Sequence, residues 1–263
     1  MGNCCCSALV LDTGSLPDGV ELVPRSAVKI QRRVTETNLG AVLTSAFSGS
    51  ATADPELGFD WCFGPELMKD RDNPMRQRML GWIFRYVLEE AFAAGPRGAV
   101  LGCRNEDGTI GAVAVLKIYR NGGGAGACEQ MIAMARAGAP KRDAERYATS
   151  SRMKAMEAAL KKLHTAYAKG PHIYVWAVGV DPSAQGHGFC GKLLHAASAV
   201  ADREQLTCYL ECCGEKNPKI YERYGYKVAG REQMVTKKTK SAEKEVCKWS
   251  YIAMVRPKKN ANN

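Results

Sequence analysis

The chain has 263 residues, 46% of them hydrophobic, so it is long enough to bury the core of one domain with tails or insertions. A formal net charge of +10 favours anionic partners such as phosphate groups or acidic lipid. The basic residues are spread along the chain rather than gathered with aromatic residues, so we expect no nucleic acid as the primary ligand. No apolar run reaches the roughly 20 residues that cross a bilayer, which excludes a transmembrane helix.

The eleven cysteines predict neither a metal site nor a disulfide framework. Three are consecutive near the N-terminus, and the others occur singly or as the pair Cys212-Cys213, without the spacing of a zinc site. Their odd number also disfavours complete pairing into disulfides. We therefore expect no bound metal and a reducing compartment.

The N-terminal sequence Met-Gly-Asn-Cys-Cys-Cys predicts a lipid anchor. Gly2 is the acceptor that N-myristoylation requires, although Cys6 stands where Ser or Thr is usual. Cys4, Cys5 and Cys6 are candidates for palmitoylation, which supplies the second signal that stable anchoring needs. We expect a tail held at the cytoplasmic face of an acidic membrane, the alternative being a tail with incidental cysteines.

The segment after this tail contains a linker and the first elements of the fold. Residues 7–27 are polar, aperiodic and contain Gly and Pro, which indicates a linker, so residues 1–27 form a tail outside the domain. Residues 28–34 alternate in a strand pattern, and residues 35–38 offer caps for a helix that continues through Phe47. Residues 48–60 are expected to form a loop.

The next third of the chain predicts a helix, a hairpin and a helical insertion. Apolar residues recur at helical spacing over residues 80–91. Residues 99–103 and 109–119 predict two strands joined through an Asp-Gly turn, the second apolar on both faces as in a central strand. After a Gly/Ala-rich excursion, helices are expected over residues 128–137 and 143–168, the second with one apolar face of Met153, Met156, Leu160 and Leu163.

A glycine-rich turn lies between a predicted strand at residues 173–180 and the following helix. Gly186, Gly188 and Gly191 remove Cβ atoms where a ligand approaches the backbone, and the free N–H groups of the helix favour an anion. The glycine spacing fits neither a dinucleotide-binding fingerprint nor a P-loop. The pattern therefore predicts a diphosphate site of another kind.

Two motifs in order identify the chain as a member of a family. The sequence Gln-Gly-His-Gly-Phe-Cys-Gly from Gln185 resembles motif A of the GCN5-related N-acetyltransferases (GNAT), with Cys190 where a smaller residue is common. A strand over residues 206–211 and the sequence Asn-Pro-Lys-Ile-Tyr-Glu-Arg-Tyr-Gly-Tyr from Asn217 are similar to the family's second motif, with Tyr226 in place of Phe. Residues 172–256 are most similar to the puromycin N-acetyltransferase branch, with one extra residue between Trp249 and Met254 of the last strand.

The resemblance implies an α/β domain with the GNAT fold, in which a mixed central sheet has helices on both faces. A splayed pair of parallel strands binds acetyl-CoA in this fold. The domain is expected over residues 28–256, with a helical insertion around 128–168 that shapes the acceptor site, followed by a polar tail at 257–263. The oligomeric state stays open.

The resemblance also implies roles for individual residues. Tyr221 would donate a proton to the leaving thiolate, the alternative being an ordinary packed tyrosine. Glu211 would act as the base, the alternative being a structural role. Residues expected to hold the cofactor lie on the strand, the turn and the second motif: Val178, Val180, Gln185, Gly186, His187, Gly188, Phe189, Cys190, Gly191, Lys192 and Asn217.

Five other side chains near this site do not indicate a single role. His172 is expected at the surface, and His187 is expected to face solvent or a phosphate. Trp176, Trp249 and Tyr251 lie on predicted strands, where each is either a core residue or a wall of the acceptor pocket.

The function predicted from the resemblance is acetyl-CoA-dependent transfer of an acetyl group to a primary amine of a small molecule by direct attack. Acetylation of a protein or peptide is an alternative, which the positive net charge disfavours because an acidic groove would then be expected. A CoA-binding sensor or scaffold without catalysis is the second alternative.

Overall fold

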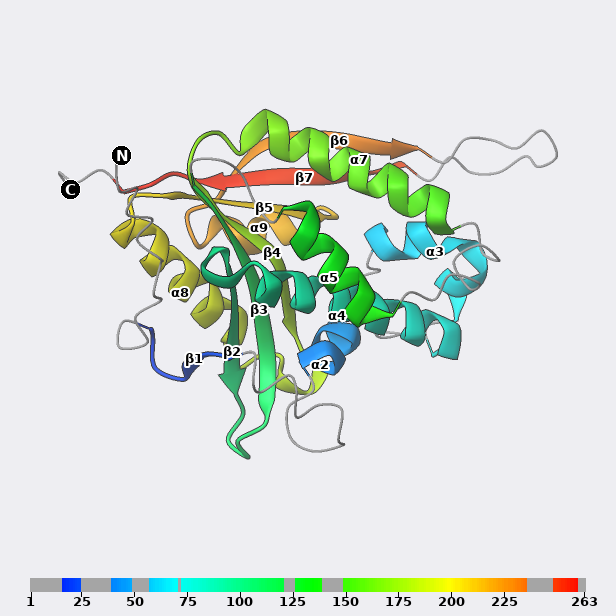
Figure 1. Ribbon diagram of the computed structural model, residues 1–263, viewed down its shortest axis with the longest axis horizontal. Helices are drawn as coiled ribbons and strands as arrows, with labels where there is room; N and C mark the ends of the chain where they lie inside the picture. Colours follow the sequence, from blue (N-terminus) through cyan, green and yellow to red (C-terminus); the bar gives the residue numbers. More distant parts are fainter. Residues whose placement is uncertain are drawn as a thin grey trace.

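The computed structural model describes residues 16–24, 39–48, 57–70, 72–120, 126–138, 149–235 and 248–259. These residues form a mixed seven-stranded sheet in the order β1-β2-β3-β4-β5-β7-β6, in which β5, β7 and β6 run across the direction of β2 and β3 (Figure 1). The strands are β1 (Val20–Leu22), β2 (Gly98–Arg104), β3 (Ile110–Tyr119), β4 (His172–Val180), β5 (Thr207–Cys213), β6 (Lys227–Val235) and β7 (Lys248–Arg256).

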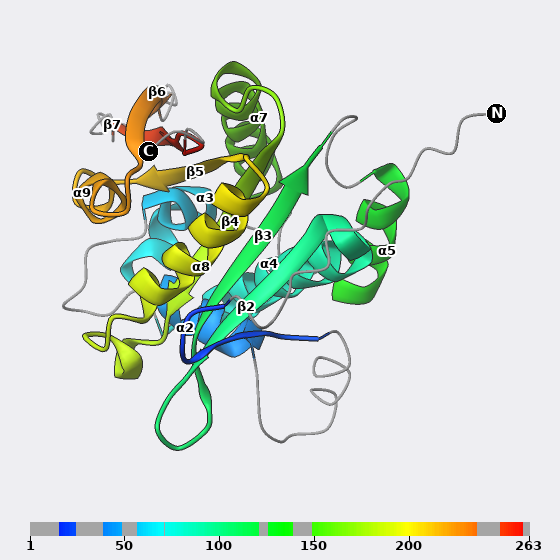
Figure 2. The same ribbon diagram turned by 90° about the vertical axis from the view of Figure 1, so that its left-hand side faces the viewer.

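Helices cover both faces of this sheet, as the sequence predicts. Residues of α2, α4 and α7 pack in one apolar cluster, and residues of α8 pack in a second cluster on the opposite face (Figure 2). The helices are α2 (Leu39–Ser48), α3 (Leu57–Lys69), α4 (Pro74–Ala93), α5 (Ala127–Ala137), α7 (Thr149–Tyr167), α8 (Phe189–Arg203) and α9 (Asn217–Glu222).

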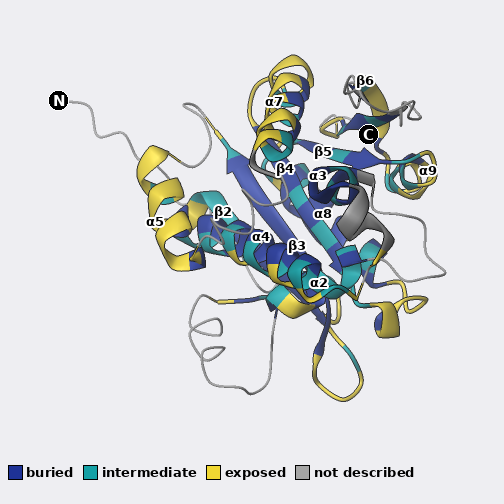
Figure 3. Ribbon diagram, turned by 90° about the vertical axis from the view of Figure 1, so that its right-hand side faces the viewer, coloured by how far each residue is buried: buried dark blue, intermediate teal, exposed yellow. Residues whose placement is uncertain are grey.

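Strand β3 is central, as its apolar pattern predicts. Val113 and Val115 belong to the cluster under α2 and α4, whereas Ala112 and Ala114 belong to the cluster under α8. Successive side chains of a strand point to opposite faces, so a strand covered on both sides must be apolar throughout. In Figure 3 β3 and β4 are correspondingly buried along most of their length.

The one parallel pair of the sheet separates after a short contact. β4 pairs with β5 only from His172–Thr207 to Tyr174–Tyr209. Two residues later Trp176 forms a β-bulge, because Val175 and Ala177 pair with consecutive residues of β3. A bulge bends its strand, and the bend accounts for the separation of β4 from β5. The predicted splayed strand pair is therefore present.

Strand β1 forms in a segment whose polar composition does not indicate a strand. It lies inside residues 7–27, which the polar composition assigns to a linker, yet it pairs antiparallel with β2. That prediction is wrong for residues 20–22. Residues 57–60, predicted as loop, instead begin α3. The strand predicted at residues 28–34 lies outside the described residues, as do residues 121–125 of the Gly/Ala-rich excursion predicted at 121–127, whose last residue begins α5.

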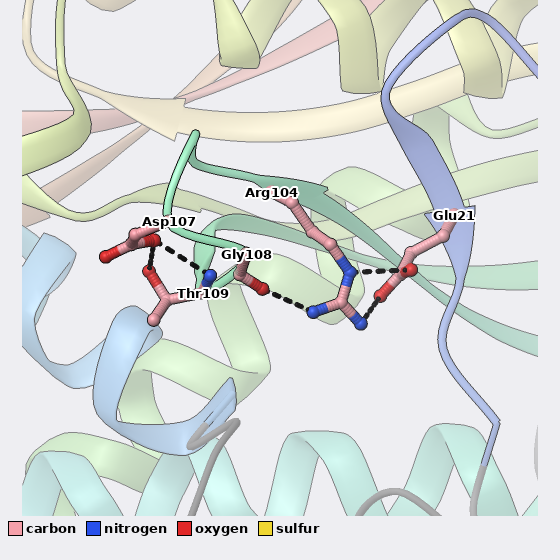
Figure 4. A network of polar contacts seen from close by, with 5 residues as sticks. All are labelled: Glu21, Arg104, Asp107, Gly108 and Thr109. Atoms are coloured by element: carbon pink, nitrogen blue, oxygen red, sulfur yellow. Dashed lines mark hydrogen bonds and ion pairs between the residues drawn. The ribbon is translucent and has the colours of Figure 1, made fainter.

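Polar contacts at the end of the β2–β3 hairpin hold β1 in place (Figure 4). The guanidinium of Arg104 donates to both carboxylate oxygens of Glu21, at 3.0 and 2.8 Å, and to the carbonyl of Gly108. Asp107 accepts hydrogen bonds from the backbone N–H and the hydroxyl of Thr109, at 2.9 and 2.6 Å, which closes the turn. The edge strand is thus fixed by side chains as well as by its ladder.

A buried ion pair joins α3 to α4. The guanidinium of Arg76 lies 2.6 Å from Asp60, and the side-chain exposures are 0% and 1%. Arg76 also donates to the carbonyl of Ser48 at 3.2 Å, which adds the end of α2 to the contact. Because both side chains are buried, each charge depends on the other for compensation.

None of the helices in the described residues is long and apolar enough to cross a membrane. The predicted lipidation sites Gly2, Cys4, Cys5 and Cys6 lie outside the part of the chain that the structure describes.

Candidate active site

A cavity of about 260 Å³ lies where β4 and β5 separate. One side, here called the wedge wall, is formed by Val178, Leu210, Cys212, Asn217 and Tyr221. The other side, here called the helix wall, comprises the cavity residues on α2, α3, α4, α5 and α7. Glu211 also lines the cavity, so four of the predicted site residues meet here: Val178, Glu211, Asn217 and Tyr221.

The edge of β4 that faces the wedge is free of strand pairing after Tyr174. Its other edge remains paired with β3 up to Val180. Backbone N–H and C=O groups that lack a strand partner are strong hydrogen-bonding groups. Residues 175–180 can therefore pair with an amide-containing chain that enters the wedge.

Asn217 and Tyr221 reach the cavity from the short helix α9, one helical turn apart. The amide of Asn217 donates to the carbonyl of Cys213 at 2.7 Å, which holds the start of α9 against the end of β5. Tyr221 is half-buried, and its ring packs at 6.1 Å from the ring of buried Tyr226. The replacement of Phe by Tyr at position 226 thus leaves the position in the core.

The glycine-rich turn begins beyond the end of β4 and opens α8. Gly186 and Gly188 have φ angles of +87° and +74°, and a Cβ added at either residue would meet no atom within 4 Å. These two positions therefore leave the backbone open to a ligand. Gly191 is different, because a Cβ there would lie 2.5 Å from Oη of Tyr224. Its lack of a side chain serves helix packing, which corrects the expectation that all three glycines make room for a ligand.

The first turn of α8 has the features of an anion site. Gly188 caps the helix without a side-chain hydrogen bond, which leaves the first N–H groups to other partners. His187 is exposed, as predicted, and its Nδ1 donates to the carbonyl of Ala184 at 3.2 Å. Gln185 and Lys192 are also exposed. Backbone dipoles and one flexible cation can thus meet a diphosphate here.

Phe189 and Cys190 face the protein instead. Phe189 is buried in the cluster under α8, and half-buried Cys190 packs against the same cluster. Burial raises the pKa of the Cys190 thiol to about 11, so it is neutral at physiological pH. Both residues can meet a ligand at this turn through their backbone rather than their side chains.

Glu211 receives hydroxyl donors from two neighbouring strands. The hydroxyl of Tyr209 donates to Oε1 of Glu211 at 2.7 Å, and the hydroxyl of Tyr174 donates to the same carboxyl group. Burial raises the pKa of Glu211 to about 7, against the opposing effect of these donors and of the Lys117 charge. A carboxyl group with this pKa can accept a proton near neutral pH.

An aromatic cluster behind Glu211 contains two histidines. Nε2 of His164 lies 3.0 Å from Nε2 of His172, whose Nδ1 donates to the carbonyl of Gly170 at 2.8 Å. Nε2 of His172 is then the acceptor for the N–H of His164. Burial lowers the pKa of His164 to about 4 and also lowers that of His172.

His172 is only 3% exposed, so the expectation of a surface histidine is wrong. It begins β4 at the one place where β4 still pairs with β5. The ring of Tyr119 stacks on it at 4.6 Å, and α7 supplies His164 above it. The exposure of a residue at the start of a strand depends on whether a helix crosses that end of the sheet. The local sequence does not determine this.

Lys117 is a residue near the site that sequence patterns did not identify. It is 8% exposed in the middle of β3, where Nζ forms an ion pair with Glu90 and lies 3.1 Å from the centroid of the Trp176 ring. Burial lowers the pKa of Lys117, which the Glu90 carboxylate opposes. A single Lys within the apolar run of β3 was the available signal, because a buried lysine requires a partner.

The structure distinguishes the two roles predicted for Trp176, Trp249 and Tyr251, a core residue or a wall of the acceptor pocket. Trp176 and Tyr251 line the cavity. Trp249 is buried outside the cavity lining and packs edge-to-face on Trp61 at 6.1 Å. Trp176 and Tyr251 are therefore pocket walls, whereas Trp249 is a core residue.

Comparison with solved structures gives the same fold. A structure from Corynebacterium glutamicum, described as histone acetyltransferase HPA2 and related acetyltransferase, is 18% identical, with a TM-score of 0.51 over 93% of this chain and 99% of that chain. Arylalkylamine N-acetyltransferase 2 from Aedes aegypti is 12% identical, with a TM-score of 0.48 over 91% of this chain and 99% of that chain. At 18% identity the first similarity supports the fold alone.

A match to a family sequence model shows the family of the chain. No curated protein matches the chain. The model of the acetyltransferase (GNAT) family matches residues 76–226, which is more than half of the chain and includes the turn, Glu211 and Tyr221. With the splayed strand pair present as well, the chain belongs to the acetyltransferase (GNAT) family, whose members are acyltransferases that use acetyl-CoA.

Proposed function

We propose that this protein transfers an acetyl group from acetyl-CoA to a primary amine of a small molecule. The observation that supports this most directly is the cavity, in which Glu211, Asn217 and Tyr221 lie beside the free edge of β4. A carboxyl group, an amide and a phenol hydroxyl thus share one small space with unpaired backbone groups. These are the groups that acyl transfer from a thioester to an amine requires.

The residues proposed to bind acetyl-CoA extend from this cavity to the start of α8. The backbone of Val178 and Val180 would pair with the pantetheine arm, and Asn217 would hydrogen-bond the same arm. The diphosphate would accept N–H donors from the turn, namely Gln185, Gly186, His187, Gly188, Phe189, Cys190 and Gly191, with Lys192 as the cation. The positive φ angles and open surroundings of Gly186 and Gly188 support this fit.

In the proposed reaction Glu211 accepts a proton from the ammonium form of the acceptor. The neutral amine then forms the new C–N bond while the C–S bond of the thioester breaks. Tyr221 donates its hydroxyl proton to the sulfur that leaves, and the proton lost from the nitrogen restores the Tyr221 hydroxyl through solvent. Direct transfer in this form needs no covalent acetyl-enzyme.

The proposed acid role of Tyr221 is tested by thiol release from acetyl-CoA across a panel of aminonucleosides, polyamines, aromatic amines and basic peptides. The Tyr221→Phe variant is expected to lower kcat about 100-fold and to leave the KM for acetyl-CoA nearly unchanged, because only a proton donor is removed. Tyr167→Phe, an exposed tyrosine on α7 away from the cavity, is the matched control and should keep full activity.

Other outcomes of this assay would contradict the proposal. Wild-type activity in Tyr221→Phe would remove the acid role of Tyr221. Thermal stabilisation by acetyl-CoA without thiol release on any acceptor would indicate a CoA-binding scaffold, and turnover of basic peptides alone would indicate a protein acetyltransferase.

We also propose that Gly2 is myristoylated and that one or more of Cys4, Cys5 and Cys6 are palmitoylated. This proposal rests on the N-terminal sequence pattern alone. Two acyl chains would hold the enzyme at an acidic cytoplasmic membrane surface, toward which the net charge of +10 is also attracted.

A further inference from the structure

We infer that the acceptor is a primary amine on an apolar body, aromatic or aliphatic, that carries no second charged group. The inference rests on the proposed function, because it assigns the amine substrate of the same site. Two observations support it: the apolar composition of the helix wall and the positions of the charged groups around the cavity.

The helix wall is apolar and largely aromatic. Phe47 and Phe84 pack at 4.7 Å between ring centroids, and Trp82 and Tyr86 stack at 6.3 Å on the same helix. Such contacts fix the rings on the α2 and α4 side. The apolar residues that α7 contributes to the helix wall are Met153, Met156 and Leu160. Methionine side chains adapt to irregular ligands, so this part of the wall can fit acceptors of different shapes.

The charged groups at the cavity are acidic. Among the described residues that line it there is no lysine or arginine, and the carboxyl groups are Glu211 and Glu157. Glu211 is assigned to the reacting amine, and Glu157 lines the cavity from α7 with a solvent-exposed side chain, so a second ammonium group of the acceptor would find only a solvated carboxylate among the described lining residues. A carboxylate on the acceptor would therefore meet only negative or apolar groups.

The buried cation Lys117 is not available to the acceptor. Lys117 lies over the ring of Trp176, whose side chain lines the cavity, and it forms an ion pair with Glu90 at 2.5 Å. Its charge is compensated within the protein, so it offers an acidic substrate no partner. The charged side chains that line the cavity are thus negative, whereas the chain as a whole has a net charge of +10.

The volume limits the size of the acceptor. About 260 Å³ is below the roughly 300–1,000 Å³ of typical ligand sites. The reacting end of acetyl-CoA must share this space along the wedge wall. The remaining room along the helix wall suits one ring or a short alkyl chain.

Three amines that differ in one charged group test the inference. Phenethylamine has an apolar body, phenylalanine adds a carboxylate to it, and 1,4-diaminobutane replaces the ring by a second ammonium group. We expect kcat/KM for phenethylamine, measured by thiol release, to exceed that for each of the others by about 100-fold, because burial of an unpaired charge is unfavourable.

A carboxylate placed on the helix wall should change this preference. Leu160→Asp puts a negative charge beside the acceptor, and its ratio of kcat/KM for phenethylamine over 1,4-diaminobutane should fall about 10-fold. Met153→Asp is the second such variant, since both side chains are half-buried and line the cavity. Ala158→Asp adds the same charge to the exposed face of α7 and should leave the ratio unchanged.

The failures of the two proposals are distinguishable. If 1,4-diaminobutane or phenylalanine is acetylated as efficiently as phenethylamine, the inference is wrong while the acetyltransferase proposal stands. An unchanged preference in both aspartate variants would also overturn it, because the helix wall would then not contact the acceptor. Absence of thiol release with every amine would remove the proposed function, and the inference with it.

Discussion

The carboxyl group of Glu211 is balanced between two opposing effects. Burial raises its pKa, whereas hydroxyl donors on Tyr174 and Tyr209 and the charge of Lys117 stabilise the carboxylate and lower it. The three groups come from β4, β5 and β3. The resulting pKa of about 7 suits a base that must accept and release protons in each cycle.

Removal of one donor should shift this balance in a known direction. In Tyr209→Phe the carboxylate loses a hydrogen bond of 2.7 Å, so the pKa of Glu211 rises. The acidic limb of the kcat/KM profile should then move to higher pH by about one to two units, since a hydrogen bond to a charged group is worth roughly 1.5–3 kcal/mol.

A variant in the same aromatic cluster provides the control for this profile. Tyr119→Phe also loses a hydroxyl, but Tyr119 is not among the described residues whose hydroxyls donate to Glu211. Its acidic limb should stay where it is in the parent protein. Equal shifts in both variants, or no shift in Tyr209→Phe, would mean that Glu211 is not the base.

At the scale of the elements, α3 and α4 depend on a contact that neither helix shows in its own sequence pattern. Asp60 and Arg76 are polar residues on helices, where exposure is usual, yet they form a buried pair. The pair also holds the end of α2 through Ser48. These helices carry much of the helix wall, so the pair supports the shape of the acceptor site.

Breaking this pair on one side should destabilise the fold strongly. Asp60→Ala leaves the guanidinium of Arg76 buried without its partner, and the free energy of unfolding should fall by about 3–5 kcal/mol. Urea denaturation measures the change. Replacement of both residues, as in Asp60→Leu with Arg76→Met, should recover most of the loss because no charge then stays buried.

An exposed pair serves as the control. Arg231 and Glu215 are bridged at 2.7 Å but are largely exposed, so Glu215→Ala should change the free energy of unfolding by less than about 1 kcal/mol. If Asp60→Ala were as mild as Glu215→Ala, the buried pair would contribute nothing to the docking of α3.

On the scale of the whole molecule, the acidic cavity lies within a strongly basic chain. The net charge of +10 favours both the phosphates of acetyl-CoA and an anionic membrane surface, while the cavity favours an amine. The two substrates would thus be attracted by opposite local charges. An acylated tail would add membrane attachment without changing the catalytic domain.

Membrane attachment is tested with the full chain in cells. Gly2→Ala prevents myristoylation, and the protein should move from the membrane fraction to the cytosolic fraction, because palmitoylation of the adjacent cysteines follows the first acylation. Replacement of Asn3 by Ser keeps the acceptor glycine and is the control. The same distribution for Gly2→Ala and the parent protein would contradict the proposal.

Local patterns in the sequence were sufficient for most of the elements around the site. The Asp-Gly turn and the two-sided apolar run predicted the β2–β3 hairpin and its central position, and both are confirmed. The glycine-rich turn and the second motif predicted the GNAT family, which is confirmed as well. β6 was missed because its sequence, Lys-Val-Ala-Gly-Arg-Glu-Gln-Met-Val, is too polar to indicate a strand without its partner β7.

The sequence by itself therefore determined the β2–β3 hairpin and the turn between β4 and α8, because turn chemistry and hydrophobic period act over a few neighbouring residues, and the resemblance of two motifs determined the family. Only the tertiary structure decided the burial of His172, the pairing of Lys117 with Glu90, and the packing of Gly191 against Tyr224. Each depends on a contact between segments that are far apart in the chain, and the local sequence does not determine such contacts. The same holds for the aromatic helix wall, which exists only because α2, α4 and α7 meet over the separated strands.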